Sequence, residues 1–326
     1  MMKISTAAAQ ILVLGISGAS ANPAAAQPAY PSKAIRLITP FAPGGGTTLV
    51  ARVIGQKMTE SWGQQVIVDN RPGGNTIIGS EALVKSPPDG YTIMLHASTH
   101  ATNPNLLPLP YDTMRDFAAI TTVSVNEYML VAHPSVPANT VKELIALAKS
   151  RPGQLDYATT GTASTQHLAT ELFALLAGIK MNHIPFKGGA PVITNLIGGQ
   201  VQLAFTGAYN AIPFIKVNRL KPIAISGDKR LSSLPKVPTF NESGLPGLDV
   251  RNWYGMFAPA ATPKPIIDKL WTEFSRIMAL PDVRENLANQ GAEPYVVPPE
   301  QFTAIIKADI ARYGKVIKAA NIKLED

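Results

Sequence analysis

The sequence contains no cysteine. This absence excludes disulfide bonds, thiol nucleophiles and thiolate metal sites, and it suits an oxidising compartment. Histidine is also scarce, and none of the five residues has the H-x-H or H-E-x-x-H spacing of a zinc site. His96 and His100 are four residues apart, but they fall in a strand and loop context. The sequence therefore gives no support for a metal centre.

The motifs of common enzyme classes are missing too. The chain has no G-x-S-x-G elbow, no G-x-x-x-x-G-K-[ST] loop and no G-x-G-x-x-G fingerprint, so neither a hydrolase elbow nor a phosphate or dinucleotide cofactor is indicated. Ser98 with His100, and Ser164 with His167, are the nearest pairs of a nucleophile and a base. Both lack an elbow, and no sequence neighbour of His167 is a carboxylate that could orient it as a base. We predict a protein that is not an enzyme and that uses no cofactor.

Long apolar runs are absent after the N-terminal segment, since no later stretch approaches the roughly 18 residues of a membrane span. The first residues combine Lys3, an apolar run over 7–16 and small residues at 24–26. This arrangement is typical of a secretory signal peptide, and we predict one over 1–26 with cleavage after Ala26. The alternative is an ordinary N-terminal helix, although no charged or capping residue interrupts the run. The mature protein is expected to be soluble and periplasmic.

Charge gives little specific information. The net charge of +7 comes from 29 basic and 22 acidic residues that are spread along the chain without long runs of one sign. This distribution does not support a nucleic-acid-binding stripe. A basic surface can attract anionic ligands from a distance, and the alternative is ordinary solubility charge.

Strand and helix patterns alternate in two sets, which is typical of mostly parallel sheets covered by helices. The first set begins with a strand over 35–39 and the second with a strand at Tyr128. We predict an α/β fold of two lobes. Domain 1 would comprise 27–127 and 252–326, with domain 2 over 128–251. The chain would cross between the lobes near Asn126 and Arg251, and the last three helices would cover the first lobe.

Two helices illustrate the expected packing. In the helix after the first strand, one face should carry Leu49, Val53, Ile54 and Met58. In the helix over 166–176, the buried stripe should contain Leu168, Leu172 and either Leu175 or Leu176.

Four loops rich in Gly, Thr, Ser and Asn follow predicted strands, two in each half of the chain: APGGGTT, RPGGNT, TTGTAST and TGAYN. Loops after parallel strands gather at the sheet edge where α/β proteins bind ligands. A glycine loop before a helix can also cradle an anion with its backbone N–H groups. Each loop alone could be only a turn, but together they favour a ligand held between the lobes.

The sequence resembles the Bug family, the periplasmic solute-binding subunits of tripartite tricarboxylate transporters, over nearly the whole mature chain. The ordered matches are YPSKAIRLITPFAPGGG, DNRPGG, PPDGYT, LPYDTMRDF, VKELIALAK, RPGQLDYA, HLATELF, IPFKGG, IGGQVQLAF, KRLSSLPKVPTFNESGLPG, WYGMFAP and QGAEP. The resemblance implies a type 2-like periplasmic binding protein fold of the Venus flytrap kind. It also implies a small carboxylate as ligand, here a dicarboxylate that could be aromatic, such as terephthalate. The expected partners are the membrane permease subunits, with no nucleic acid, and we expect a monomer.

The family's ligand-binding positions can be transferred to this sequence by motif. In the first lobe they correspond to Phe41, Ala42, Pro43, Gly44, Gly45, Gly46, Thr47, Thr48, Gly74, Asn75 and Thr76. In the second lobe they correspond to Thr159, Thr160, Gly161, Thr162, Ala163, Ser164, His167, Lys187, Gly188 and Thr206. The predicted site also includes Ser98 and Gly207. His167 would position the threonine-rich loop or hydrogen-bond the ligand.

Three departures from the family pattern affect specificity. Thr48 stands where the family usually has Asp, Thr206 and Gly207 replace an Asp-Asn pair, and RPGGNTIIG replaces RPGAGGNIG. We hypothesise that the two missing carboxylates disfavour solutes with an ammonium group and favour purely acidic ones. Two other functions stay open at this point: the ligand-sensing subunit of a signalling system, and a periplasmic hydrolase.

Overall fold

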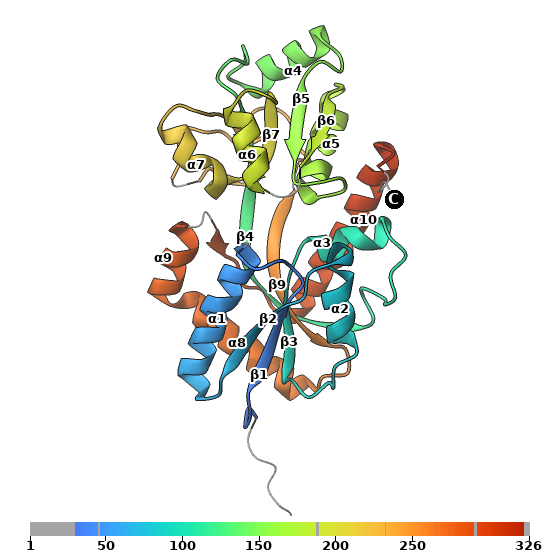
Figure 1. Ribbon diagram of the computed structural model, residues 1–326, viewed down its shortest axis with the longest axis vertical. Helices are drawn as coiled ribbons and strands as arrows, with labels where there is room; N and C mark the ends of the chain where they lie inside the picture. The colour runs from blue at the N-terminus through green and yellow to red at the C-terminus, as the bar shows by residue number, and fades with distance from the viewer. Residues whose placement is uncertain are drawn as a thin grey trace, which may run out of the picture.

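The computed structural model describes residues 30–44, 46–186, 189–231, 233–248, 250–289 and 292–322. The expected signal peptide lies outside the described residues. The described chain forms two lobes, one above the other in Figure 1, with long strands passing between them. The predicted two-lobe α/β fold is confirmed.

In the first lobe, β1 (Ile35–Thr39) lies between β2 (Val66–Asn70) and β3 (Thr92–Ala97), and both pairings are parallel. Isoleucines and leucines make β1 almost fully buried, as expected of a strand covered on both faces. The helical segments of this part of the chain are α1 (Gly46–Trp62), η1 (Gly74–Thr76), α2 (Ile77–Val84), α3 (Thr99–Thr102) and η2 (Asn103–Asn105).

The second lobe repeats this arrangement. Its central strand β5 (Asp156–Thr159) pairs in parallel with β6 (Asn182–Pro185) and β7 (Leu203–Gly207). The remaining elements are α4 (Val141–Ser150), α5 (Thr165–Ala177), α6 (Gly189–Ile197), α7 (Ala208–Lys216) and β8 (Lys221–Ile225). The sequence did not reveal α7, and TGAYN is therefore the end of β7 and the start of a helix instead of a loop.

One long strand belongs to both sheets. The strand β4 (Phe117–Ala132) pairs antiparallel with β9 (Arg251–Pro259) as far as Glu127. From Tyr128 onward it pairs with β7 and then also with β8. The strand order is β2-β1-β3-β9-β4-β7-β5-β6, with β8 and β10 (Glu293–Pro294) also paired to β4. The lobes are therefore joined by continuous antiparallel strands.

Three helices follow β9: α8 (Lys264–Ala279), α9 (Pro281–Asn289) and α10 (Pro299–Ala319). As expected, α8 packs against α1 and β4 in the first lobe. The last helix extends further, because α10 contacts both β4 and α5 of the second lobe. It runs obliquely across Figure 1 and ends beside the second lobe.

The predicted helix faces are only partly correct. In α1 the buried side chains include Ile54 and Met58, but Leu49 is exposed. In α5 the stripe continues from Leu168 and Leu172 to Phe173, while Leu175 and Leu176 are exposed. Both helices contain apolar residues that are not buried, so composition alone does not show which apolar residues face the core.

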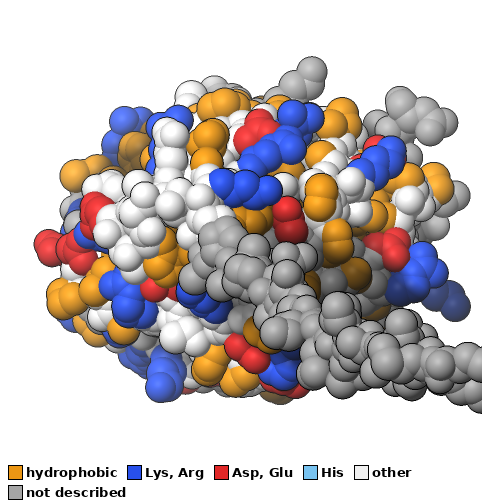
Figure 2. Space-filling model, turned by 90° about the horizontal axis from the view of Figure 1, so that it is seen from below, with side chains coloured by type: hydrophobic (Ala, Val, Ile, Leu, Met, Phe, Trp, Pro, Cys, Tyr) orange, Lys and Arg blue, Asp and Glu red, His pale blue; other side chains and the backbone are white. Residues whose placement is uncertain are grey.

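Charged side chains are mixed on the surface. Figure 2 views the end of the first lobe and shows Lys and Arg side chains interspersed with acidic and apolar ones. The described part of the chain contains no candidate membrane-spanning helix.

Candidate functional site

A cavity of about 380 Å³ lies between the lobes, where the loops after β1 and β5 meet the crossing strands. Its size falls within the range of small-molecule sites, about 300–1,000 Å³. It is lined by Phe41, Ala42, Pro43, Gly46, Thr47, Ala97, Thr99, Tyr128, Thr160, Ser164, Thr165, Gln166, Asn252 and Tyr254.

No Lys, Arg, His, Asp or Glu is among the described residues that line this cavity. The polar groups there are hydroxyls, amides and backbone N–H groups. Gly46 begins α1 and Thr165 begins α5, so the N-terminal ends of two helices, one in each lobe, face the same space. Free N–H groups and the positive end of the helix dipole favour an anion at such a position.

Hydrogen bonds from Thr48 and Asn70 hold the first glycine-rich loop, which follows β1. The Thr48 hydroxyl donates to the Ala42 carbonyl at 3.3 Å and accepts from Asn70 Nδ2 at 2.8 Å. Asn70 Nδ2 also donates to the Phe41 carbonyl at 2.9 Å. Thr48 is fully buried and does not line the cavity. Its role in the structure is to fix the loop.

The second glycine loop has an unusual backbone. Asn75 (φ 50°) and Thr76 (φ 78°) are both left-handed, a costly conformation for a β-branched residue such as threonine. Asn103, which is 1% exposed, holds them in place. Its Nδ2 donates to the Asn75 carbonyl at 2.7 Å and to Thr76 Oγ1 at 3.1 Å, and its Oδ1 accepts from Asn75 Nδ2 at 2.9 Å. Strain held in this way is common at ligand-binding sites.

In the second lobe, Ser164 caps α5. Its hydroxyl accepts from the His167 backbone N–H at 3.3 Å, and the Thr160 hydroxyl donates to Gln166 Oε1 at 2.8 Å. The loop is also fixed from below, because the N–H of Ala163 donates to His167 Nδ1 at 3.0 Å. Ala163 has φ 60°, so this bond holds a left-handed residue.

His167 belongs to a cluster of polar side chains with Tyr157, Glu171 and His183. Its ring stacks on His183 at 3.8 Å between centroids, and the Tyr157 hydroxyl donates to Glu171 Oε1. Burial, with a smaller contribution from His183, lowers the pKa of His167 to about 3, and burial lowers the pKa of His183 to about 4. Burial also raises the pKa of Glu171. Both imidazoles are therefore neutral near pH 7, and His167 supports the loop as a hydrogen-bond acceptor.

Ser98 and His167, one from each serine–histidine pair, have other hydrogen-bond partners. The Ser98 hydroxyl donates to Asn252 Oδ1 at 2.9 Å and lies 3.4 Å from Thr165 Oγ1. His167 Nδ1 is occupied by the N–H of Ala163. In the described structure no hydrogen bond links Ser98 to His100, or the Ser164 hydroxyl to the His167 ring, as nucleophilic activation would require.

The structure distributes the predicted residues in three groups. Those that line the cavity are Phe41, Ala42, Pro43, Gly46, Thr47, Thr160 and Ser164. Those that do not are Gly44, Thr48, Gly74, Asn75, Thr76, Ser98, Thr159, Gly161, Thr162, Ala163, His167, Thr206 and Gly207. Gly45, Lys187 and Gly188 lie outside the described residues. The assignment of all these residues to a ligand site stays a prediction.

The other half of the lining residues are not among the predicted site residues. Ala97 is the last residue of β3 and Thr99 follows that strand, whereas Thr165 and Gln166 begin α5 after β5. The rule that loops after strands bind ligands therefore also indicates these four residues. Tyr128, Asn252 and Tyr254 lie on the two crossing strands. Tyr254 belongs to the WYGMFAP match. Tyr128 and Asn252 belong to no glycine-rich motif, and their only sequence signal is their proximity to the expected crossings.

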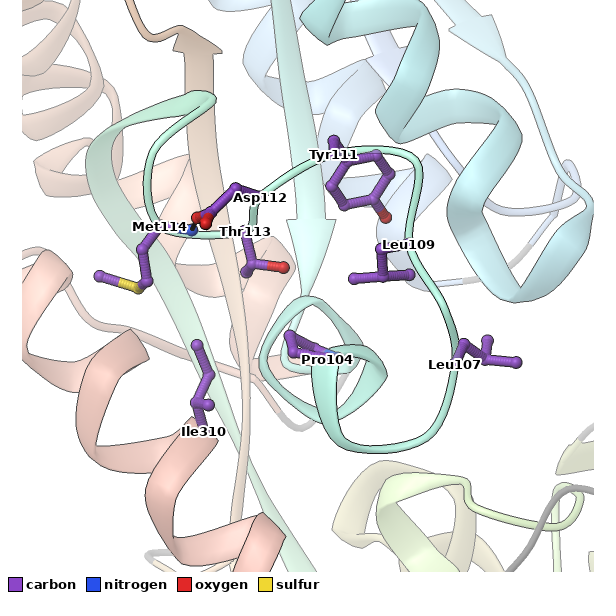
Figure 3. Close-up of a pocket in the computed structure, with 8 residues that line it drawn as sticks. All are labelled: Pro104, Leu107, Leu109, Tyr111, Asp112, Thr113, Met114 and Ile310. Atoms are coloured by element: carbon purple, nitrogen blue, oxygen red, sulfur yellow. Dashed lines mark hydrogen bonds between the residues drawn. The ribbon is translucent and has the colours of Figure 1, made fainter.

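A second cavity, of about 340 Å³, lies on the first lobe between the segment after η2 and α10. In Figure 3, Met114 and Ile310 lie on one side of Pro104, with Leu107 and Leu109 on the other. Its wall contains part of the LPYDTMRDF match, and it shares no lining residue with the cavity between the lobes.

Known proteins are similar to this chain in sequence and in fold. Residues 50–322 match the family described as "Tripartite tricarboxylate transporter family receptor". The chain is 35% identical to Protein BugT of Bordetella pertussis over 320 residues, covering 97% of this chain and 98% of BugT.

Solved structures agree with these matches. A Rhodopseudomonas palustris protein with adipate is 31% identical with a TM-score of 0.80, over 90% of this chain and 99% of that one. MatC of the same organism, with bound malate, is 30% identical with a TM-score of 0.75, over 88% and 100%. The periplasmic binding protein BugD is 32% identical with a TM-score of 0.77, over 91% and 100%. The chain therefore belongs to the receptor family of the tripartite tricarboxylate transporters, the periplasmic solute-binding proteins of the Bug and TctC kind.

Proposed function

We propose that this protein captures a small dicarboxylate in the cavity between its lobes and delivers it to the membrane permease of a tripartite tricarboxylate transporter. The observation that carries the proposal is the convergence of two helix N-termini, from α1 and α5, on one cavity without described charged side chains. A ligand with a carboxylate at each end could meet both helix ends. The adipate and malate bound by two relatives are dicarboxylates, which supports this ligand class.

Helix ends alone do not provide sufficient affinity. Each contributes about 0.3–1 kcal/mol in exposed settings, whereas a micromolar ligand needs about 8 kcal/mol in total. Hydrogen bonds from loop N–H groups and hydroxyls must supply most of the remainder, with apolar contact from side chains such as Phe41 and Tyr254. A ligand that touches both lobes stabilises the closed arrangement, which the permease can recognise.

We propose in addition that residues 1–26 are a signal peptide removed on export, and that the mature protein acts as a monomer. Residues 27–127 with 252–326, and residues 128–251, would be the bodies that move about the crossing strands. The permease would then meet the exported, ligand-loaded form.

The ligand class can be tested by calorimetric titration of the mature protein with adipate, malate, succinate and terephthalate. The amino acid aspartate and the monoacid nicotinate serve as controls. We expect succinate to bind more tightly than aspartate, because the described cavity wall offers no carboxylate to an ammonium group. Terephthalate should bind more tightly than nicotinate, because nicotinate has only one carboxylate for the two helix ends. Tighter binding of aspartate than of succinate would contradict the proposal.

A further inference from the structure

Asn252 occupies the floor of the cavity at the point where the chain passes between the lobes. It is the second residue of β9 and pairs in register with Asn126 of β4. Two residues further along β4, at Tyr128, pairing with β9 has ended and pairing with β7 begins. Asn252 is partly exposed and lines the cavity between Tyr128 and Tyr254.

A short chain of polar contacts connects Asn252 to both lobes. The fully buried Ser98, after β3 of the first lobe, donates to Asn252 Oδ1 at 2.9 Å. The single hydroxyl proton of Ser98 is used in this bond. The Ser98 oxygen is therefore the acceptor in its 3.4 Å contact with the hydroxyl of Thr165, the first residue of α5. Thr165 is 3% exposed and belongs to the second lobe. The contact therefore exists only when the lobes are close together.

This arrangement determines what Asn252 can offer to a ligand. Its Oδ1 is occupied by Ser98, and no described residue accepts a hydrogen bond from its Nδ2. An amide nitrogen carries two N–H donors and no acceptor. The group available on the cavity floor is thus a pair of neutral donors suited to an anionic oxygen.

We propose that Asn252 is a specificity-determining ligand residue, whose amide N–H groups donate to a carboxylate oxygen of the bound acid, and that Ser98 and Thr165 link this contact to closure of the lobes. The proposal rests on the proposed function and deepens it. Recognition would then depend on a residue of the crossing strand as well as on the glycine-rich loops. The amide N–H groups at this point can donate to a carboxylate oxygen, but they cannot accept a hydrogen bond from an ammonium group.

The test replaces the donor with an acid of nearly the same shape. We expect Asn252→Asp to weaken adipate binding at least 100-fold at pH 7.5 in calorimetric titration, because a carboxylate replaces two donors beside the ligand anion. Asn241→Asp is the matched control: it adds the same charge at an exposed turn and should bind like the wild type.

A pH series distinguishes ligand contact from a structural role. As the pH falls to 5.5, the ratio of variant to wild-type Kd should shrink, because the introduced carboxyl group can donate a hydrogen bond once it is protonated.

Two further variants cover the case in which Asn252→Asp does not fold. Asn252→Ala should lose about tenfold in affinity, and Ser98→Ala should lose less, while both keep a cooperative thermal transition. The inference is overturned if the wild type binds adipate and the folded Asn252 variants bind it within threefold of the wild type, or if the Asn252→Asp ratio does not change with pH. A wild type that binds none of adipate, malate and terephthalate would instead refute the proposed function itself.

Discussion

At the scale of single residues, Asn103 is notable because it lies away from the cavity yet holds a loop of the predicted site. Three hydrogen bonds join it to Asn75 and Thr76, both of which are left-handed. No sequence pattern pointed to Asn103, because it lies in a short 3-10 segment that the sequence did not reveal.

We expect Asn103→Asp to weaken dicarboxylate binding about 5- to 100-fold, because the acid loses both donors and places an acceptor against the Asn75 carbonyl. Calorimetry with adipate measures the effect. Asn105→Asp is the control, since that exposed side chain donates to the Ile310 carbonyl and lies away from the loop. Equal losses in the two variants would show that a general charge effect is responsible.

Thr48 shows what a residue-level comparison can miss. The sequence suggested that an acid is absent from the cleft at this position, whereas the structure places the Thr48 side chain inside the first lobe, between Asn70 and the Ala42 carbonyl. An acid at 48 would therefore change how the loop is held. The positions at which an introduced charge would face the cavity directly are those of its wall, such as Ser164 and Asn252.

At the scale of elements, the N-terminus of α5 contributes both to the stability of the helix and to the wall of the cavity. Ser164 caps its N-terminus and also lines the cavity. Thr140 caps α4 in the same way, by accepting from the Glu143 N–H at 3.2 Å, but it is exposed and lines no described cavity. The two caps offer a controlled comparison.

We expect Ser164→Asp to keep the stability of the ligand-free protein within about 1 kcal/mol, because aspartate is a good cap and favours the helix dipole. The same variant should lose most of its affinity for adipate, since it places a carboxylate in the cavity wall. Thr140→Asp should preserve both properties. Urea unfolding and titration of each variant measure the two quantities separately. Unchanged affinity in Ser164→Asp would exclude a ligand carboxylate at this helix end.

The sequence predicted most elements, because strands, turns and caps are specified locally, but TGAYN, predicted as a loop, is the end of β7 and the start of α7. The sequence was less successful where partners distant in sequence decide. In α5, Phe173 is buried and Leu175 is exposed because only one side of the helix faces the rest of the fold. The crossing-strand residues Tyr128 and Asn252 reach the cavity only through the pairing of β4 with β9.

At the scale of the whole molecule, buried histidines make stability dependent on pH. Burial lowers the pKa of His96 and of His183 to about 4, that of His167 to about 3, and that of His100 well below its usual value. Each is neutral in the folded protein but takes up a proton near pH 6.5 when unfolded. The unfolded state then binds more protons, so stability is lost as the pH falls from about 6.5 toward 4. Glu171, with its raised pKa, opposes this trend.

We expect urea unfolding at pH 5 to give a lower free energy of unfolding than at pH 7.5, with His96 alone accounting for about 2 kcal/mol. His96→Phe should reduce this difference, because the ring would remain among Phe41, His100 and Phe257 without a titrating group. A stability profile that stays flat between these pH values would contradict the assignment of neutral buried imidazoles.

The shared strand β4 also limits how the chain can be rearranged. Its first eleven residues belong to one sheet and its last five to the other, with pairing to β9 ending at Glu127 and pairing to β7 beginning at Tyr128. A circular permutant opened in β4 before Glu127 would interrupt the sheet of the first lobe, and one opened after Tyr128 would interrupt the sheet of the second lobe. In evolutionary terms, neither lobe can be exchanged as a cassette unless its share of this strand is exchanged with it.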